Sequence, residues 1–269
     1  MAGFELPPPP PTQSNPGHNQ WDLGVVVAFG YMLPPDLIAS FPMSMINAHG
    51  SLLPKFKGAA PMQYSIITGE KEAGVSITAL HPTRIDAGRV MTRHPVALTA
   101  QSTYSSIAPI LSEKSAAAMV DVLKNWDLRM QESVEQSVLE QRLGTPPAEK
   151  LRCPKIRPPF CFVNFRKTAE ETSCLVRGLH GFESAFASFQ GKRVFFEDIA
   201  VVKIFENEKE MAEDKPTEVD GVPDYEKTVL SNLKRDPNVD YSLPGVVCYD
   251  RVNKCVVITC ADKTYIKVR

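Results

Sequence analysis

The sequence predicts an α/β protein in which a parallel sheet is followed by a small β-barrel. Short apolar runs alternate with helical patterns over residues 21–140, and this alternation is typical of a parallel α/β sheet. Residues 161–269 instead contain several short strands in succession, separated by turn residues, which favours a barrel. With 269 residues, 43% of them apolar, the chain is long enough to bury two cores.

Four strands are expected in the first part. "LGVVVAF" at 23–29 is almost wholly apolar, as in a strand covered on both faces. "SMINAH" at 44–49, "GVSITAL" at 74–80 and "GRVMTRHPVAL" at 88–98 follow it. Together they predict an incomplete parallel sheet over 21–140.

Helices are expected between these strands. "LPPDLIASFP" at 33–42 has prolines suited to a helix start, and "APMQYSIITG" at 60–69 ends in Gly69, a typical C-cap. Residues 103–140 read as helical, and Pro109 fits the first turn of a helix that begins near Ser106. These assignments complete the alternation expected of a parallel sheet.

Composition sets the remaining boundaries. Residues 1–20 contain a five-proline run and predict a disordered lead-in, and the proline-rich stretch 141–160 predicts a linker. "TAEETSCLVRGLHGF" at 168–182 predicts an amphipathic helix at the start of the second domain, which we place at 161–269. Within that domain, 206–240 is acidic and poor in apolar residues, so we expect a disordered insertion there.

Other features narrow the class of protein. No apolar run reaches the length that spans a bilayer, so no membrane partner is expected. The six cysteines lie in the second half without a C-x-x-C pair, which indicates buried thiols and predicts no metal site. They are Cys153, Cys161, Cys174, Cys248, Cys255 and Cys260.

Three polar side chains follow two of the predicted strands. Asn47 and His49 end the second strand, and Asp86 follows the third in "HPTRIDAG". Ligands bind at the carboxyl ends of parallel strands, so we expect these side chains to converge. An Asn amide can stabilise an oxyanion, a His can move a proton, and an Asp can support the charged imidazole. This set suits acyl transfer to an amine, although His81 competes for Asp86 and most histidines are purely structural.

The motif around these residues resembles the signature of the folate-dependent formyltransferases. "INAHGSLLPKFKGAAP" followed by "IDAG" matches the family pattern of Asn-x-His, Ser-Leu-Leu-Pro, a basic Gly-rich turn and a downstream Asp-x-Gly. The resemblance implies a Rossmann-like formyltransferase fold, with 10-formyltetrahydrofolate as formyl donor and co-substrate and no metal. By resemblance, Asn47 polarises the formyl oxygen, His49 assists proton transfer and Asp86 supports His49. The donor pocket it implies is formed by Phe29, Gly30, Tyr31, Leu33, Ser51, Leu52, Leu53, Pro54, Arg84 and Ile85.

Within that family the chain is similar to the methionyl-tRNA formyltransferases. "GAAPMQ" and "CPKI" match that group, as do the helix and the OB-like barrel, which holds tRNA in those enzymes. The resemblance implies a monomeric enzyme that formylates initiator methionyl-tRNA for translation initiation. It also implies a mitochondrial location in a eukaryote and a cytoplasmic one otherwise. Family members carry further strand–helix units before the equivalent of Leu23, so we expect an N-terminally incomplete sheet.

Charge in the second part agrees with an RNA partner. Outside the acidic segment, residues 151–269 contain 14 basic and 7 acidic residues, although the whole chain has a net charge of −1. A basic surface is what a phosphate backbone requires. The predicted tRNA-binding residues are Lys55, Lys57, Lys155, Arg157, Arg166, Lys167, Lys192 and Arg193.

Two other functions stay open at this point. One is a non-catalytic homologue that binds tRNA or a partner protein through the barrel. The other is a folate-dependent formyltransferase that acts on a small amine or a sugar, since such enzymes share "HGSLLPK" and "DAG".

Overall fold

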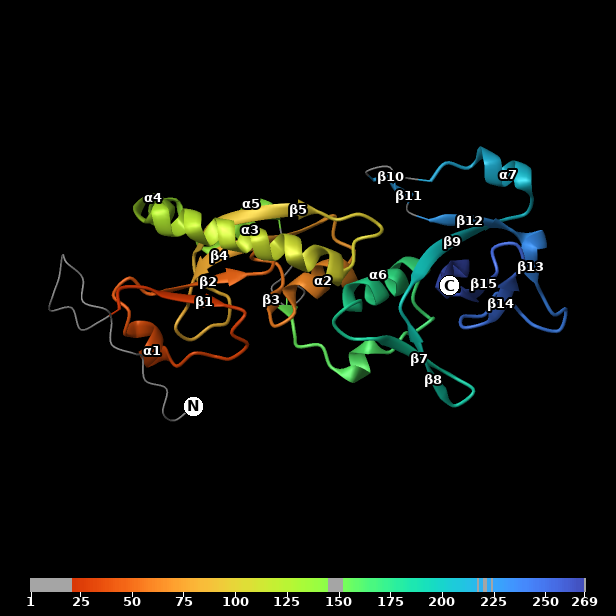
Figure 1. Cartoon of the computed structure of the whole chain (residues 1–269), viewed down its shortest axis with the longest axis horizontal. Helices are drawn as coiled ribbons and strands as arrows, with labels where there is room; N and C mark the ends of the chain where they lie inside the picture. Colours follow the sequence, from red (N-terminus) through yellow and green to blue (C-terminus); the bar gives the residue numbers. More distant parts are fainter. Residues whose placement is uncertain (1–20, 145–151, 217, 220–221, 224, 269) are drawn as a thin grey trace. The chain divides into compact units, whose positions relative to one another are not determined.

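The computed structural model of the chain describes residues 21–144, 152–216, 218–219, 222–223 and 225–268 (Figure 1). The predicted lead-in 1–20 and the centre of the predicted linker lie outside these residues. The chain divides into two compact units. The first comprises the described residues of 1–61, 74–95 and 111–154, and the second those of 62–73, 96–110 and 155–269.

A four-stranded sheet forms the centre of the first unit. Its strands are β1 (Gly24–Val27), β2 (Met45–His49), β4 (Glu72–Ala79) and β5 (Val90–Ala97), in that spatial order. All four occupy the predicted segments, so the α/β class is confirmed. The predicted direction of the strands is corrected, because only β1 and β2 are parallel, whereas β2 and β4 are antiparallel.

The loop between β4 and β5 explains part of this mixed sheet. The Ala79 N–H donates to Arg89 O at one end, and the Leu98 N–H donates to Lys71 O at the other, so β4 and β5 also run in opposite directions. A parallel connection needs a crossover of a dozen or more residues, and the loop between Ala79 and Val90 is too short for one. Strand–helix alternation therefore gave the elements correctly but not their directions.

The helices of this half begin and end close to their predicted positions. In α1 (Pro35–Ala39) a proline occupies the first turn, as expected, and α2 (Pro61–Ile67) is followed by Gly69 at φ +70°. The long helical segment is divided into α3 (Tyr104–Lys124), α4 (Trp126–Glu132) and α5 (Gln136–Leu143). Pro109 lies inside α3, so that helix begins slightly earlier than predicted.

A pair of short strands joins two parts of the first unit that are distant in sequence. Strand β3 (Lys57–Gly58) pairs in parallel with β6 (Arg152–Cys153), on the far side of the helical segment in sequence. The turn between β2 and β3 is held by Ser76, whose hydroxyl donates to Ser51 O and accepts from the Leu53 N–H. These contacts fix the segment that follows His49.

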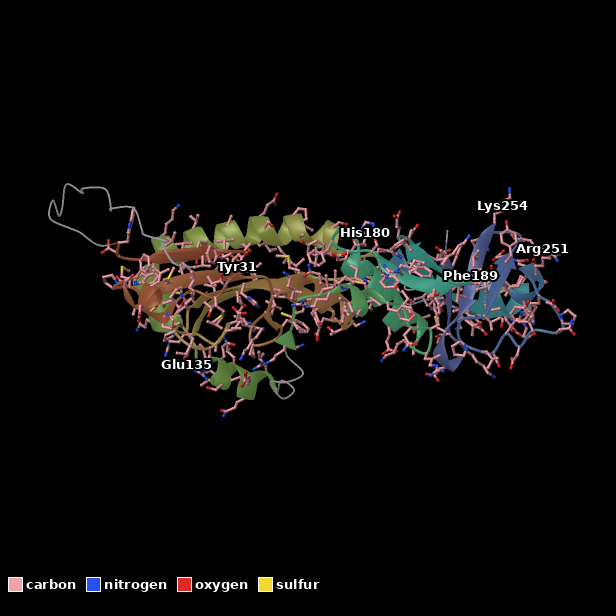
Figure 2. The ribbon with its side chains drawn as sticks, turned by 90° about the horizontal axis from the view of Figure 1, so that it is seen from below. Tyr31, Glu135, His180, Phe189, Arg251 and Lys254 are labelled. Atoms are coloured by element: carbon pink, nitrogen blue, oxygen red, sulfur yellow. The ribbon has the colours of Figure 1, made fainter. Side chains whose placement is uncertain are left out.

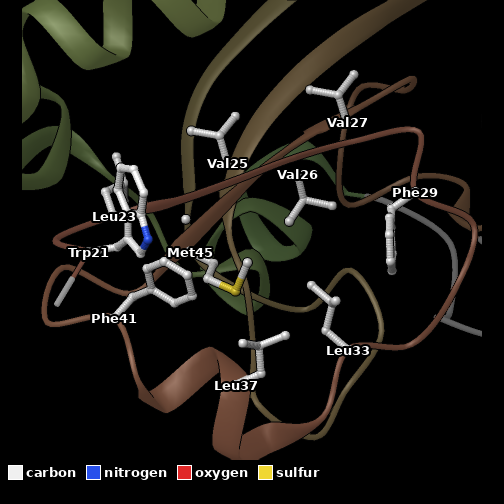
Figure 3. A pocket seen from close by; sticks show the side chains of 11 residues that line it. Trp21, Leu23, Val25, Val26, Val27, Phe29, Leu33, Leu37, Phe41 and Met45 are labelled. Atoms are coloured by element: carbon white, nitrogen blue, oxygen red, sulfur yellow. The ribbon is translucent and has the colours of Figure 1, made fainter. Parts of the chain in front are cut away.

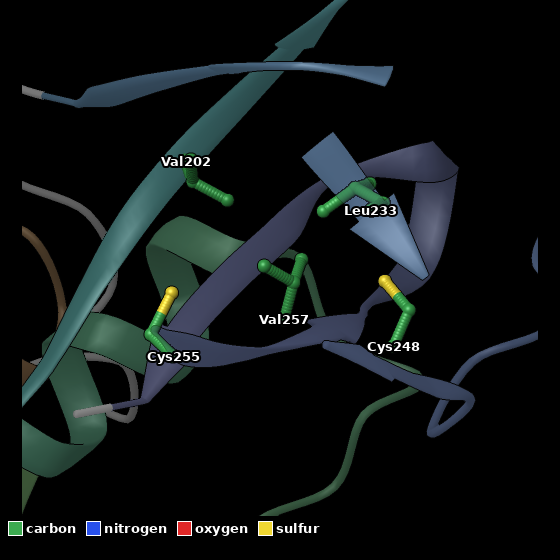
Figure 4. Close-up of a cluster of buried hydrophobic side chains, with 5 residues drawn as sticks. All are labelled: Val202, Leu233, Cys248, Cys255 and Val257. Atoms are coloured by element: carbon green, nitrogen blue, oxygen red, sulfur yellow. The ribbon is translucent and has the colours of Figure 1, made fainter. Parts of the chain in front are cut away.

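The second unit is built on a six-stranded sheet in the order β12-β9-β16-β15-β14-β13. The strands are β9 (Ile199–Phe205), β12 (Glu226–Val229), β13 (Leu233–Lys234), β14 (Val247–Asp250), β15 (Cys255–Thr259) and β16 (Tyr265–Val268). Buried Val202, Cys255 and Val257 form part of its core (Figure 4).

This sheet curls toward a barrel. Thr228 on β12 donates a buried hydrogen bond of 2.7 Å to the carboxylate of Asp250, at the end of β14. These two strands are first and fifth in the order, so the bond forms only if the sheet bends back on itself. Its edge strands β12 and β13 do not pair in the described residues, so the predicted OB-like barrel is an open half-barrel here.

The acidic segment 206–240 differs from its predicted disorder. Its described residues include α7 (Glu208–Glu213), the short pair β10 (Glu218–Val219) and β11 (Val222–Pro223), and two strands of the main sheet, β12 and β13. The acidic composition suggested disorder, but charged side chains of this segment pair with partners on the sheet. Glu226 on β12, for example, accepts a hydrogen bond from Lys267 on β16 at 2.6 Å. Deleting this segment would remove two strands from the sheet.

Helix α6 (Ala169–Leu179) lies within the predicted amphipathic segment and begins at a capping box. Thr168 accepts from the Glu171 N–H, and the Glu171 carboxylate accepts from the Thr168 N–H. Before and after this helix lie 3₁₀ turns at Pro158–Cys161, Leu230–Asn232 and Ala261–Lys263. The hairpin of β7 (Ala185–Phe189) and β8 (Lys192–Phe196) follows α6 as a separate two-stranded sheet.

Five of the six cysteines are buried, in agreement with the prediction of buried thiols. Burial raises the pKa of the Cys153 thiol to about 12. In the part of the chain that the structure describes, no helix is long and apolar enough to cross a membrane.

Candidate active site

The second strand places Asn47 and His49 on one face of the sheet, because side chains two residues apart point the same way. His49 is only 5% exposed. Its Nε2 lies 2.9 Å from the carbonyl oxygen of Phe56. A carbonyl only accepts hydrogen bonds, so Nε2 carries the proton and Nδ1 holds the free lone pair of a neutral ring.

The other imidazole nitrogen faces Asp86. Nδ1 lies 3.6 Å from Oδ1 of that carboxylate, which is beyond hydrogen-bond distance but close enough for an ion pair when the ring is protonated. Asp86 is 15% exposed, so its carboxylate lies between the buried ring and solvent. His81, the alternative partner, is instead engaged in its own loop, where Nδ1 accepts from the Arg84 N–H at 3.1 Å.

Asp86 reaches His49 by a route that the sequence did not suggest. In the antiparallel pairing His49 lies opposite Ser76, whereas Ala79 at the end of β4 lies opposite Ile46. Asp86 is therefore not carried to His49 by the end of its strand. The loop after β4 must turn back along the sheet, and it does so with Asp86 at φ +46°, in the left-handed region.

Several hydrogen bonds hold that loop in place. The amide of Gln136, at the start of α5, donates to Asp86 O at 2.7 Å and to Gly88 O at 2.8 Å. The hydroxyl of Thr78 donates to Gly88 O at 3.1 Å. A Cβ on Gly88 would lie 1.8 Å from Ala79 O, so only glycine allows the loop to pack this closely.

Strands β3 and β6 complete the frame around the pair. The Gly58 N–H donates to Asp86 Oδ2 at 2.9 Å, which fixes the second carboxylate oxygen. The Cys153 thiol donates to the same Phe56 carbonyl that His49 contacts, at 2.9 Å. A Cβ on Gly58 would lie 2.6 Å from Cys153 O, so β3 can pair with β6 only through glycine.

Asn47 differs from its neighbours because its amide forms no hydrogen bond to the described part of the chain. It is partly exposed and lies two residues before His49. A free amide beside a histidine–aspartate pair is available to donate to a carbonyl oxygen of a bound molecule. The described residues contain no cluster of three His, Cys, Asp or Glu side chains that could hold a metal ion.

The residues predicted to hold the donor divide into two groups. Ser51, Leu52, Leu53 and Pro54 are buried: Leu53 is 0% exposed, and the Ser51 hydroxyl donates to Lys55 O within the turn. Their positions show a structural role in the turn after β2. Phe29, Gly30, Tyr31, Arg84 and Ile85 are exposed and Leu33 is partly exposed, so these six can contact a ligand.

An apolar cavity lies beside the first strand. It has a volume of about 420 Å³, and Phe29 and Leu33 line it together with Trp21, Leu37 and Met45 (Figure 3). Its lining side chains are almost wholly apolar, whereas ligand pockets usually add polar groups that orient the ligand. The cavity therefore fits an apolar part of a ligand better than a polar ring.

The predicted tRNA-binding cations differ in their surroundings. Lys57 pairs with Glu140 at 3.2 Å, and Lys167 pairs with Glu171 at 2.8 Å. Lys155, Arg157, Arg166, Lys192 and Arg193 are exposed, with no carboxylate partner among the described residues, and Lys55 is partly exposed. The exposed group belongs to the second unit.

Sequence reasoning missed Gln136 and Cys153, which act on the site through backbone carbonyls. Neither is part of a recognisable motif, and both lie far from the signature in sequence. The signal for Cys153 in the sequence is "CPKI", which lies in the predicted linker.

Comparison with known proteins shows which proteins the chain resembles. Residues 12–123 match the family model described as formyl transferase. The site of Asn47, His49 and Asp86 lies within the matched residues.

Relatives narrow the class further. The chain is 33% identical over 165 residues to the methionyl-tRNA formyltransferase of Protochlamydia amoebophila, covering 61% of this chain and 49% of that protein. It is 36% identical over 109 residues to a mitochondrial methionyl-tRNA formyltransferase of Rattus norvegicus, covering 40% of this chain and 28% of the relative. The chain is thus similar in sequence to methionyl-tRNA formyltransferases and spans half or less of the length of these two relatives.

A solved structure agrees on the fold. The sugar 3N-formyl transferase WlaRD, crystallised in the presence of dTDP and 5-N-formyl-THF, matches with a TM-score of 0.54 at 14% identity. The match covers 91% of this chain and 71% of that one, so the likeness extends across both units.

Proposed function

We propose that the chain transfers a formyl group from 10-formyltetrahydrofolate to the amino group of methionyl-tRNA. The observation that carries the proposal is the apposition of His49 and Asp86 beside the free amide of Asn47. The names of the sequence relatives support methionyl-tRNA as acceptor, and the 5-N-formyl-THF of the WlaRD crystals supports a folate donor.

The residues divide the chemistry between them. As the acceptor amine attacks the formyl carbon, negative charge develops on the formyl oxygen, and the Asn47 amide donates a hydrogen bond to it. The amine loses a proton to the His49–Asp86 pair, and a proton received at Nδ1 lies between the ring and the carboxylate. When the bond to the donor nitrogen breaks, that nitrogen takes the proton, so the pair returns to its starting state.

The frame around the pair determines which nitrogen reacts. Phe56 O holds the Nε2 proton, and the Gly58 N–H and Gln136 keep the Asp86 carboxylate against the other side of the ring. Both states of the imidazole are thus accommodated without movement of the backbone, which is the preorganisation that efficient proton transfer requires.

Formyl donor and tRNA would use different surfaces. The donor would contact the exposed members of its predicted set: Phe29, Gly30, Tyr31, Leu33, Arg84 and Ile85. The acceptor tRNA would lie against the exposed cations of the second unit, because phosphate contacts need unpaired Lys and Arg. We further propose initiator methionyl-tRNA as acceptor, a monomeric protein, and a mitochondrial site of action in a eukaryotic cell.

The experiment offers the full chain a panel of acceptors. Radiolabelled 10-formyltetrahydrofolate is supplied with methionyl-tRNA, with uncharged tRNA or with an amino sugar nucleotide, and the label on each product is counted. We expect label on methionyl-tRNA alone. Label on the sugar would support the small-amine alternative, and tRNA binding without any label would support the non-catalytic one.

A further inference from the structure

The hairpin β7–β8 carries an aromatic face that the second unit does not cover. Cross-strand pairing places Phe186 opposite Phe195, and Ser188 opposite Arg193. Alternation along the strands puts these four on one side and buried Ala185, Ala187 and Phe196 on the other. The outer side is open: Phe195 is 55% exposed.

A third ring extends this face. Phe162 forms a bridge with Phe186, its ring centroid lies 5.7 Å from that of Phe186, and it is 46% exposed. The rings of Phe186 and Phe195 are 6.3 Å apart. We call Phe162, Phe186, Phe195 and Arg193 the aromatic face.

Positive charge is interleaved with these rings. The guanidinium of Arg193 lies 4.8 Å from the centre of the Phe186 ring, and Lys192 precedes it at the hairpin turn, opposite Phe189 on the other side of the hairpin. Neither cation has a carboxylate partner in the described chain. Residues 184–196 contain no acidic residue, so the hairpin is purely positive.

Exposed aromatic rings beside unpaired cations are suited to one class of ligand, single-stranded nucleic acid. Single-stranded nucleic acid offers flat bases that stack on aromatic rings and phosphates that pair with Lys and Arg. An apolar protein partner would leave the two cations unpaired on binding, and a duplex would hide its bases from the rings. The combination therefore favours unpaired nucleotides.

We propose that the aromatic face binds an unpaired stretch of RNA, with a base stacked on Phe195 and an adjoining phosphate on Arg193, while Lys192 at the hairpin turn adds positive charge beside the face. This inference deepens the proposed tRNA acceptor and rests on it. It assigns to the hairpin the recognition of unpaired nucleotides, which a basic surface alone does not provide.

The test compares three substitutions at one ring in the full-length chain. Phe195→Leu keeps an apolar side chain and removes the ring, Phe195→Ala removes both, and Phe195→Tyr keeps the ring. Binding of a fluorescent single-stranded oligoadenylate and of an RNA duplex of equal charge is measured by anisotropy. We expect Phe195→Leu and Phe195→Ala to weaken single-strand binding at least about fivefold, and Phe195→Tyr to retain it.

Matched controls separate stacking from charge. Lys254, an exposed cation on another hairpin, is replaced by Ala, and this change should leave single-strand binding within about twofold (Figure 2). Arg193→Ala should weaken it, because the hairpin loses a phosphate contact. Far-UV circular dichroism confirms that each variant is folded.

Three results would overturn the proposal. The first is that Phe195→Leu binds the single strand as tightly as the unmodified chain. The second is that the duplex binds as tightly as the single strand and is weakened as much by the Phe195 substitutions. The third is that the chain binds no oligonucleotide. Formylation of methionyl-tRNA is assayed on the same variants. If methionyl-tRNA is formylated but the Phe195 substitutions do not weaken RNA binding, only the RNA-binding role of the aromatic face is rejected. If RNA binding depends on Phe195 but no formylation occurs, only the proposed catalysis is rejected.

Discussion

Replacing Gln136 by Met should slow formyl transfer without weakening tRNA binding. Gln136 is 4% exposed, and its amide nitrogen makes the only hydrogen bond that the structure describes to Asp86 O. Met has a similar volume and no donor, so the change removes two hydrogen bonds without opening a cavity. Gly88 O keeps the bond from Thr78, so one carbonyl rather than two is left unpaired.

The size of the effect follows from these contacts. A buried acceptor left without a partner costs about 1–3 kcal/mol. Part of this is offset, because Gln136 Oε1 is buried without a hydrogen-bond partner in the described residues and is removed as well. A net cost of about 1–2 kcal/mol, acting on a loop with Asp86 at a left-handed φ, corresponds to a rate lowered about 5- to 30-fold.

Single-turnover formylation at saturating donor and tRNA measures this rate, and filter binding measures the tRNA Kd. Gln141→Met, on the exposed side of the same helix, is the matched control and should behave as the unmodified chain. A normal rate in Gln136→Met with lowered thermal stability would show that Gln136 supports the fold alone and does not position Asp86.

Three further predictions concern the second unit. Charge reversal at Lys192 and Arg193 should weaken tRNA binding and lower the slope of log Kd against log salt by about 2, because two phosphate contacts are lost; an unchanged slope in filter binding would exclude these contacts. Thr228→Val should destabilise the unit by about 1.5–3 kcal/mol at pH 7, since it removes a hydrogen bond to the Asp250 carboxylate. Burial raises the pKa of that carboxyl, but hydrogen bonds from Asn253, Val252 and Thr228 outweigh it and hold the pKa below its usual value. The loss should therefore shrink as pH falls through that pKa in urea titrations, and a pH-independent loss would contradict this account. Burial also raises the pKa of the Cys260 thiol to about 11, so the unfolded chain loses this proton first and stability falls as pH rises above about 9. Between pH 8 and 10 the native chain should lose about 1 kcal/mol more stability than Cys260→Ala, and equal losses would refute the shift.

The site shows what a sequence can and cannot provide. Asn47 and His49 were predictable, because two residues on one strand necessarily share a face. The approach of Asp86 was predicted on the basis of parallel strand ends, yet β2 and β4 are antiparallel and the loop turns back to bring Asp86 to His49. Asp86 and His49 do lie close together, but not for the reason that strand direction suggested.

Long-range contacts explain what could not be predicted. Gln136 and Cys153 reach the site through backbone carbonyls 50 and 97 residues away in sequence, which no local pattern encodes. The same applies to strand β12, where Glu226 and Thr228 find their partners in Lys267 and Asp250, residues far along the chain. Composition describes a segment in isolation, whereas its partners decide whether it folds.

The most direct test of the central claim is single-turnover formylation of methionyl-tRNA by the full chain and by His49→Ala. The account predicts formyl-methionyl-tRNA from the unmodified chain and a rate lowered at least about 100-fold in the variant, the usual contribution of a proton-transfer group. Equal rates would remove His49 from the mechanism, and no product from the unmodified chain would contradict the proposed activity.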